Sequence, residues 1–381
     1  MSRPIPGDYI FNALRDRQCI VMACNTRIIK GVTRGIFRAA KKLDSAVIIE
    51  IARSECDQNG GYIGLTPVMF AEMIKKIADE VGHDIWALHA DHIGIKKGDA
   101  EDIAQTKQFI KAQIDAGFTS FAIDASHLFN FNGSTVYEEL EPNINATIEI
   151  GKFILENMKG RDFGLEVEVG EIGRKNEKGM VLTTPEEAVV FISSLNKAGL
   201  FPQVLAIANG SEHGNVYDEC GKQIKKLSIN SERTKEISRA LRNNNLNVRI
   251  AQHGISGTPR EMIYAQFPHG DIVKGNVATF WQNMFHEIIK VHCPELFTEI
   301  VDWTIISYKE AAKKAGIKTE EEIFGKYGKF ATKQFFNRIY SIDEEAEQAV
   351  EAMAYAEALT FFKAFRSKGT AEIVRRYLSS K

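Results

Sequence analysis

The chain has 381 residues, of which 44% are hydrophobic and 26% are charged, and its formal net charge is −2. These values are ordinary for a globular protein, and the length suits one large α/β domain with an extension, or two domains. The near-zero charge and the lack of a basic block argue against nucleic-acid binding. No run of the sequence is long and apolar enough to span a bilayer, so we expect no membrane partner.

The N-terminal residues and the cysteines indicate a cytoplasmic protein. Residues 1–8 lack the apolar core of a secretory signal. The cysteines are scattered and form no CxxC pair, which is typical of free thiols in a reducing compartment rather than of disulfides or a cysteine zinc site. They are Cys19, Cys24, Cys56, Cys220 and Cys293.

Apolar runs alternate with helical patterns along most of the chain. A short amphipathic helix over residues 8–17 comes first and could cover the bottom of a barrel. Each apolar run that follows is typical of a parallel strand buried on both faces. Helices between the runs begin with Thr-Pro pairs at Thr66 and Thr184, in which threonine caps the helix. The expected strands cover residues 19–25, 46–52, 84–91, 120–126, 164–170, 204–210, 248–253 and 271–277.

Eight strands alternating with helices favour an α/β fold of the (β/α)8 TIM-barrel type over an open doubly wound sheet. The first strand is not followed by a glycine-rich dinucleotide fingerprint, which also counts against a Rossmann domain. After about residue 281 the strand pattern stops and helical patterns continue to the end. We therefore expect a catalytic barrel over residues 1–282 and a helical C-terminal extension over residues 283–381.

Titratable residues stand where several of the expected strands end. The clearest stretch is residues 89–92, in which two imidazoles and a carboxylate follow an apolar run. In a barrel, such strand ends converge on one site. His92, His213 and His253 come from three separate strands, and three nitrogen ligands with one open position suit a catalytic Zn²⁺. The alternative is that each histidine is a hydrogen-bonded structural residue.

Further polar groups extend this predicted site. Glu166 and Glu168 share one face of the fifth strand, so one could be a metal ligand while the other is a buried partner for a lysine or arginine. Residues 252–258 and 274–279 follow the last two strands, where barrels often bind phosphate through glycines and hydroxyl donors. Tight turns without a ligand are the alternative there. His89 lies deeper on its strand, and we expect it to support the site.

A series of short motifs along the chain resembles the motifs of a known enzyme family. In order, HADH (89–92), LEVEVG (165–170), TTPEEA (183–188), AIANGSEHGNVY (206–217), AQHGISGTP (251–259) and VKGNVAT (273–279) resemble the motifs of the class II, metal-dependent ketose-bisphosphate aldolases. The ordered series is specific, whereas any single motif would be weak. Residues 49–70 also resemble the proteins described as non-catalytic subunits of tagatose-bisphosphate aldolase. Sugar C4-epimerases are among the relatives of those subunits.

The resemblance implies a metal centre in the barrel. His92, His213 and His253 would bind Zn²⁺, with Glu168 nearby as an alternate ligand. Another divalent ion would also suit this set, and an additional monovalent cation is compatible with it.

The resemblance also implies the roles of other residues. Asp91 would transfer the proton at the C4 oxygen, and Glu177, on the loop after the fifth strand, would exchange the proton on the carbon of dihydroxyacetone phosphate. The positions that match the dihydroxyacetone-phosphate site are Gly214, Gly254, Ser256, Asn276 and Thr279. We add Asn25 and Lys274, on the first and eighth strands, as substrate-binding candidates.

The activity that the resemblance implies is reversible cleavage of a ketose 1,6-bisphosphate, fructose or tagatose. The products would be dihydroxyacetone phosphate and glyceraldehyde 3-phosphate, and we expect a homo-oligomer. The alternatives are a sugar C4-epimerase with the same retro-aldol chemistry, a Schiff-base aldolase using a lysine such as Lys274, and a non-catalytic aldolase subunit.

Departures from the family motifs leave the sugar open. Ala278 stands where fructose-type enzymes carry aspartate and tagatose-type enzymes carry alanine. Ala52 stands in place of a usual serine, and Tyr217 and Asp218 stand in place of a usual lysine. The loop that contains Glu177 departs from the usual Gly-Gly-Glu-Asp pattern.

Overall fold

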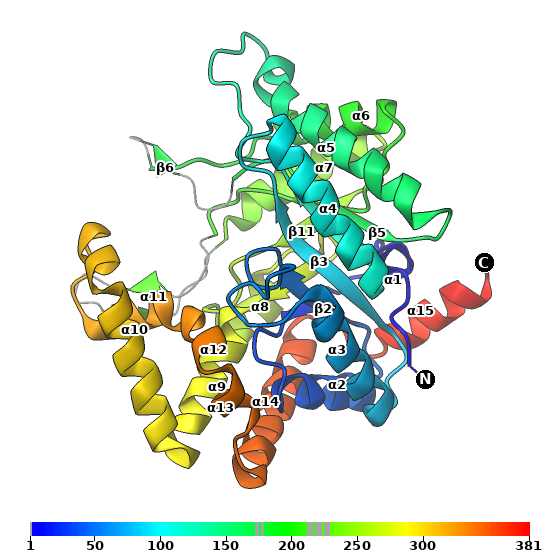
Figure 1. Cartoon of the computed structure of the whole chain (residues 1–381). Coiled ribbons are helices and arrows are strands. Elements are labelled where there is room, and N and C mark those ends of the chain that lie inside the picture. Colours follow the sequence, from blue (N-terminus) through cyan, green and yellow to red (C-terminus); the bar gives the residue numbers. More distant parts are fainter. Residues whose placement is uncertain (1, 172–174, 177–178, 212–215, 218–222, 225–228) are drawn as a thin grey trace.

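A computed structural model describes residues 2–171, 175–176, 179–211, 216–217, 223–224 and 229–381. Eight parallel strands close into a barrel in the order β1-β12-β11-β8-β5-β4-β3-β2 (Figure 1). The expected (β/α)8 barrel is therefore confirmed. Its strands are β1 (Val21–Asn25), β2 (Val47–Ala52), β3 (Trp86–Gly94), β4 (Ser120–Asp124), β5 (Gly164–Glu168), β8 (Val204–Ala206), β11 (Arg249–Gln252) and β12 (Ile272–Val277).

Short hairpins and helices complete the barrel part of the chain. The described hairpins are β6 (Lys175–Asn176) with β7 (Gly179–Met180), and β9 (Val216–Tyr217) with β10 (Gln223–Ile224). The expected Thr-Pro helix starts are confirmed, because the Thr66 and Thr184 side chains accept hydrogen bonds from backbone N–H groups of the first turn. The helices are α1 (Gly7–Leu14), α2 (Val32–Leu43), α3 (Pro67–Val81), α4 (Ala100–Ala116), α5 (Val136–Met158), α6 (Pro185–Lys197), α7 (Ser231–Asn243) and α8 (Arg260–Gln266).

Helix α5 begins earlier than the sequence indicated. The sequence alone predicts a helix over residues 143–158, whereas in the structure the helix starts at Val136, with Pro142 inside it. The Thr135 side chain accepts a hydrogen bond from the backbone N–H of Glu138, which stabilises the earlier start. A proline inside a helix removes one backbone hydrogen bond and is usually unfavourable, so the pattern alone pointed to a later start.

Helix α1 closes the bottom of the barrel, as expected. Its buried residues Ile10, Phe11 and Leu14 belong to an apolar cluster that includes Ala23 and Ile48 from the strands. It packs against β3, β5 and β12. Because apolar side chains fill this end, the polar residues of the strands gather towards the other end.

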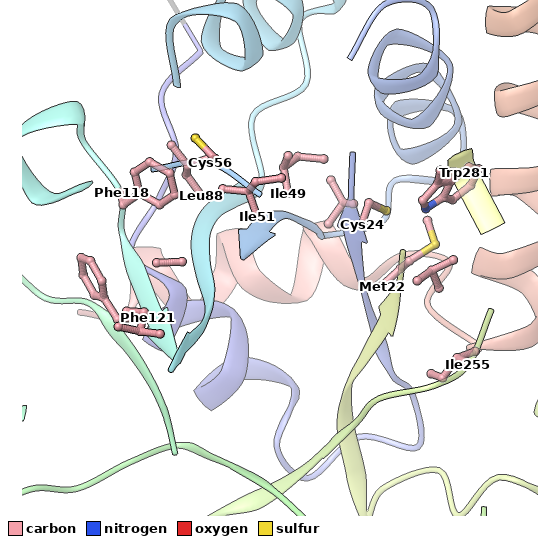
Figure 2. Packing of buried hydrophobic residues seen from close by; sticks show 14 of the residues in the cluster. Met22, Cys24, Ile49, Ile51, Cys56, Leu88, Phe118, Phe121, Ile255 and Trp281 are labelled. Carbon is pink, nitrogen blue, oxygen red and sulfur yellow. The ribbon is translucent and has the colours of Figure 1, made fainter. Parts of the chain in front are cut away.

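The larger apolar cluster surrounds the barrel. Figure 2 shows Cys24 of β1 and Ile49 and Ile51 of β2 within this packing. Successive side chains of a strand point to opposite faces, so the residues between these point into the barrel. Asn25 and Glu50 pair in register on β1 and β2. Both therefore extend from the inner face, near the carboxyl ends of their strands.

The C-terminal helices have two places in the fold. Helix α14 packs against α2, α8 and α9, where it completes the ring of helices around the barrel, and α15 packs against α1. Helices α10 and α11 project from one side (Figure 1). The domain boundary at residue 282 stays a prediction. The helices are α9 (Thr279–His292), α10 (Pro294–Lys314), α11 (Glu320–Tyr327), the 3₁₀ helix η1 (Gly328–Phe330), α12 (Ala331–Gln334), α13 (Phe336–Tyr340), α14 (Glu344–Ala364) and α15 (Thr370–Ser379).

The contact between α2 and α14 depends on a glycine. A Cβ at Gly35 would lie 2.5 Å from the Glu351 carbonyl oxygen and 2.7 Å from the Ala354 Cβ. We expect Gly35→Ala to lower the free energy of unfolding by ~1–2 kcal/mol, since overpacking outweighs the gain of ~1 kcal/mol in helix propensity. Chemical denaturation measures the change. Gly257→Ala is the control, because nothing lies within 4 Å of a Cβ there. An unchanged denaturation midpoint for Gly35→Ala would contradict this prediction.

Two other expectations concern cysteines and membranes. Cys19, Cys24, Cys56 and Cys293 are free thiols, as expected, and Cys220 lies outside the described residues. None of the helices in the described part of the chain combines the length and apolar character that crossing a bilayer requires.

Candidate active site and metal centre

The end of strand β3 places Asp91 and His92 at the mouth of the barrel. The strand continues to Gly94, past its expected end, and its register with β4 shifts between Ala90 and Ile93. His92 lies in this bulge with φ of 41°, in the left-handed region that side chains with a Cβ rarely adopt. Bulges next to active sites re-aim side chains, and backbone strain of this kind gathers at functional positions.

His92 and His253 face each other in a geometry that fits a metal ion. His92 Nε2 lies 3.1 Å from His253 Nδ1. Two nitrogen ligands on one tetrahedral Zn²⁺ would be separated by roughly 3.3 Å. An oxygen of Asp91 and one nitrogen of each histidine lie within 4.8 Å of one another. On its other side, His253 Nε2 lies 3.3 Å from Glu166 Oε1, and such carboxylates hold ligating imidazoles in position. The donor set therefore fits a divalent metal.

Glu168 lies against the other nitrogen of His92. Its Oε2 is 3.5 Å from His92 Nδ1, and Asp124 Oδ2 is 3.4 Å from the same atom. Burial, and then the charge of Asp124, raises the pKa of Glu168 well above its usual range. Glu168, His92 and Asp124 thus form a second group of possible metal ligands, next to the His92–His253 pair. Its role as an alternate ligand stays a prediction.

Lys274 lies deeper in the barrel, inside a buried ionic cluster. Its Nζ is 2.7 Å from Glu166 Oε2, 3.0 Å from Glu50 Oε2 and 3.3 Å from Asp91 Oδ1. Burial alone would lower the pKa of Lys274, but these carboxylates raise it well above its usual range, so the ammonium stays charged. Glu166 is therefore the buried partner of a lysine, which is one of the two roles that the sequence left open for it.

Two carboxyl groups of this cluster are held in opposite protonation states. Burial, followed by the charge of Asp91, raises the pKa of Glu50 to about 8. Burial would also raise the pKa of Asp91, but the charges of Lys274 and His92 lower it below its usual range. At neutral pH, Asp91 is therefore ionised beside the histidines, whereas Glu50 is mostly protonated.

His89 supports this cluster from below, in agreement with its expected role. It is fully buried, with Nδ1 2.7 Å from Ser120 Oγ and Nε2 3.0 Å from Lys274 Nζ. Because Lys274 can only donate, His89 Nε2 accepts this hydrogen bond and the imidazole is neutral. Burial, and then the charge of Lys274, lowers the pKa of His89, which agrees with this neutral form.

A cavity of about 1240 Å³ opens over these groups. Residues of α9 and α11 form part of its wall together with the barrel rim. Ser256 Oγ accepts a hydrogen bond from the backbone N–H of Ala278 at 3.2 Å, which ties the two predicted phosphate loops together. The expected site residues that line the cavity are Asn25, Asp91, His92, His253, Gly254, Ser256, Asn276 and Thr279.

Several other expected residues have different places. Lys274 is fully buried beneath the rim. The candidates His213, Gly214 and Glu177 lie outside the described residues. The sequence alone predicts an ordinary packing or surface role for His286, which packs near Phe324 and also lines the cavity.

Sequence reasoning missed some residues of the cavity wall, notably Glu50, Arg27, Glu55 and Gln282. Glu50 had a readable signal, because it is the one charged residue in the apolar run 46–52. Arg27 and Gln282 had none, since they meet only when α9 packs over the end of β1.

The (β/α)8 barrel thus carries, at its rim, a pair of histidines and a carboxylate that together fit a divalent metal ion. The sequence profile described as class-II fructose-bisphosphate aldolase matches residues 7–354, and the chain belongs to this family. The resemblance drawn from the motifs is thus confirmed. The family is typically metal-dependent and is named for an aldolase.

Named relatives match parts of the chain. The 6-phospho-5-dehydro-2-deoxy-D-gluconate aldolase of Halalkalibacterium halodurans is 28% identical over 230 residues, which cover 59% of this chain and 64% of that protein. The D-tagatose-1,6-bisphosphate aldolase subunit GatZ of Escherichia coli O157:H7 is 35% identical over 86 residues, which cover 21% of this chain and 20% of that protein. This chain therefore spans less than two thirds of the length of either relative.

Solved structures match almost the whole chain. The YdjI aldolase of Escherichia coli K12 has a TM-score of 0.61 at 19% identity, with 97% of this chain and 99% of that chain covered. The fructose-bisphosphate aldolase of Campylobacter jejuni has a TM-score of 0.61 at 17% identity, with 97% of each chain covered. At these identities the similarity shows the shared fold.

Proposed function

We propose that this chain catalyses the reversible, metal-dependent aldol cleavage of a phosphorylated ketose. The main support is the approach of His92 Nε2 and His253 Nδ1 to 3.1 Å beside the buried carboxylate of Asp91, in a chain of the class II aldolase family. The substrate in this proposal is fructose or tagatose 1,6-bisphosphate, and the products are dihydroxyacetone phosphate and glyceraldehyde 3-phosphate. The metal is Zn²⁺, with His213 as the third ligand.

The side chains divide the chemistry among them. His92, His213 and His253 would hold a divalent ion, which would supply Lewis-acid chemistry to the substrate. Asp91 takes the proton of the C4 hydroxyl as the C3–C4 bond breaks, and returns it in the reverse reaction. Lys274 Nζ and Asn276 Nδ2 each lie 3.3 Å from Asp91 Oδ1 and hold this carboxylate at the cavity wall. In this proposal Glu177 exchanges the proton on the dihydroxyacetone-phosphate carbon.

Other candidates bind and position the substrate. Gly254, Ser256 and Thr279 lie around the cavity after β11 and β12, where their N–H and hydroxyl groups would receive the first phosphate. The motif position of Gly214 assigns it to the same site. Because Lys274 is fully buried and charged, we assign it to holding Asp91 rather than to substrate contact or a Schiff base.

A non-catalytic subunit is the second candidate, because the GatZ relative is named as a subunit of an aldolase. The paired histidines and the ionised Asp91 favour catalysis within this chain. A C4-epimerase would use the same groups but would rejoin the fragments before release. The homo-oligomeric state and the cytoplasmic location stay predictions.

Metal removal tests the proposal. We expect the zinc-loaded protein to release triose phosphate from fructose or tagatose 1,6-bisphosphate, and the EDTA-treated protein to lose this activity until Zn²⁺ is restored. NMR spectroscopy follows triose phosphate and sugar epimer together. Epimer without free triose would favour the epimerase instead. A protein that binds no divalent ion and acts on neither sugar would favour the non-catalytic subunit.

A further inference from the structure

Two buried amide side chains, Asn209 and Gln252, bond to each other where β8 and β11 end. Asn209 is 0% exposed and Gln252 is 1% exposed. Asn209 Nδ2 donates to Gln252 Oε1 at 2.6 Å, and Gln252 Nε2 donates to Asn209 Oδ1 at 3.2 Å. Each amide therefore fixes the orientation of the other, and we call these two residues the amide pair.

The remaining N–H group of each amide reaches a different part of the protein. Asn209 Nδ2 also donates to Thr234 Oγ1, on α7, at 2.9 Å. Gln252 Nε2 also donates to the backbone carbonyl oxygen of His253 at 2.8 Å. A side-chain amide carries two N–H donors, so all four donors of the amide pair are in use. A buried polar network whose members are all satisfied is held in one geometry.

The bond to the His253 carbonyl fixes a residue that lies beyond its strand. Strand β11 and its pairing with β12 end at Gln252, and Gly254 turns the chain with φ of 71°. The imidazole of His253 is used on both sides, because Nδ1 lies 3.1 Å from His92 Nε2 and Nε2 lies 3.3 Å from Glu166 Oε1. The Gln252 side chain thus holds the peptide from which this imidazole extends.

The amide pair also anchors the start of α7. Thr234 Oγ1 donates to the Asn230 carbonyl oxygen at 3.1 Å, and the Asn230 backbone N–H donates to the Asn209 carbonyl oxygen at 2.8 Å. In the sequence, Asn209 and Asn230 flank residues 210–229, which include His213, the proposed third ligand. The hydrogen bonds of the amide pair therefore connect the peptide of one proposed ligand with both ends of the segment that contains another.

We propose that Asn209 and Gln252 are positioning residues, which hold His253 in the orientation that binds the metal ion. The proposal rests on the proposed function for the identity of the metal site. Burying two amides is unfavourable unless their hydrogen bonds are made, and apolar side chains would fill the same space without this requirement. Hydrogen-bonded partners that orient metal ligands contribute to metal affinity. A purely structural amide pair would contribute to stability alone.

The metal affinity of the full chain tests the proposal without turnover. Zn²⁺ is titrated into the metal-free protein in competition with a chromophoric chelator, which gives the dissociation constant. We expect Gln252→Met to weaken Zn²⁺ binding roughly 10- to 100-fold, the usual range for residues that orient metal ligands. Methionine has a similar size but donates no hydrogen bond to the His253 carbonyl.

Gln203→Met is the matched control. Gln203 lies just before β8, at the opposite end of the strand from the amide pair. Its Nε2 donates to the Phe201 carbonyl oxygen at 2.9 Å, and its Oε1 accepts from the Leu165 backbone N–H at 2.8 Å. This variant also loses side-chain amide hydrogen bonds, so its stability should fall while its Zn²⁺ affinity stays that of the wild type.

A double variant separates positioning from stability. In Asn209→Leu/Gln252→Met, neither amide is left buried without its partner. We therefore expect the denaturation midpoint of the metal-free protein to recover relative to the single variants Asn209→Leu and Gln252→Met. The Zn²⁺ affinity should stay low, because the His253 carbonyl still lacks its donor. The double variant also remains informative where a single variant does not fold.

The proposal is overturned if Gln252→Met binds Zn²⁺ as tightly as the wild type, or if affinity recovers together with stability in the double variant. Either result assigns the amide pair to stability alone. Failure of the proposed function is seen separately, as the absence of triose-phosphate release by a wild type that binds Zn²⁺. A wild type that binds no Zn²⁺ contradicts both proposals.

Discussion

Replacing Asp91 with asparagine is expected to lower kcat by roughly 10²- to 10⁴-fold, the usual contribution of general acid–base catalysis. Asparagine has almost the same shape and can still accept hydrogen bonds from Lys274 and Asn276, but it cannot take the C4 proton. Metal content should be unchanged, because the proposed ligands remain. Triose-phosphate release measures kcat, and elemental analysis measures bound metal per chain.

The control for this variant is Asp115→Asn, which removes an exposed carboxylate from α4. Its kcat should match that of the wild type. If Asp91→Asn keeps full activity, Asp91 does not transfer the proton. If the variant loses metal together with activity, Asp91 is a metal ligand rather than a base.

Lys274→Met is expected to lower the free energy of unfolding by ~3–5 kcal/mol at pH 7, the cost of leaving buried charges without their partner. Lys274 Nζ lies 2.7 Å from Glu166 and 3.3 Å from Asp91, and methionine offers neither of these ionised carboxylates a charge. Lys107→Met is the matched control. Its ion pair with Glu149 is on the surface, where such pairs contribute ~0–1 kcal/mol.

The loss caused by Lys274→Met should depend on pH, and the sign can be worked out. Burial would raise the pKa of Glu166, but Lys274 lowers it well below its usual range. Stability from such a lowered pKa is present above the unfolded value of about 4.3 and is lost as the pH falls through the folded value. Without Lys274, the buried carboxyl groups take up protons more readily, so the variant recovers towards the wild type as the pH falls from 7 to 4.

Denaturation of the EDTA-treated proteins at several pH values measures this difference without a contribution from bound metal. A gap between Lys274→Met and the wild type that stays constant or widens towards pH 4 would contradict the assigned charges. A loss no larger than that of Lys107→Met at pH 7 would show that the buried cluster does not depend on Lys274.

The sequence predicted the barrel because each strand is a local signal. Apolar runs and helix caps such as those at Thr66 and Thr184 can be recognised from residues that are neighbours in the sequence. Features that depend on tertiary packing were not predicted. The bulge at His92 needs the pairing of β3 with β4, and the place of α14 needs the close approach at Gly35.

The residues of the candidate site also fall into those that the sequence predicts and those that only tertiary packing brings together. Asp91, His92 and His253 were predicted together because strand ends of a barrel converge, and the structure brings them together. Arg27 and Gln282 meet across 255 positions of sequence, and no local pattern marks such a contact. His213, Gly214 and Glu177 remain predictions from the motifs.

The barrel strands and the late helices form the wall of the cavity together, and this has an evolutionary consequence. The histidines and Asp91 are carried by the barrel strands, whereas Gln282, Lys329 and their neighbours come from helices late in the chain. Mutations in that late segment can therefore remodel the wall while the reactive groups stay in place. Duplicated genes could in this way diversify their sugars through one region of the chain and conserve their chemistry through another.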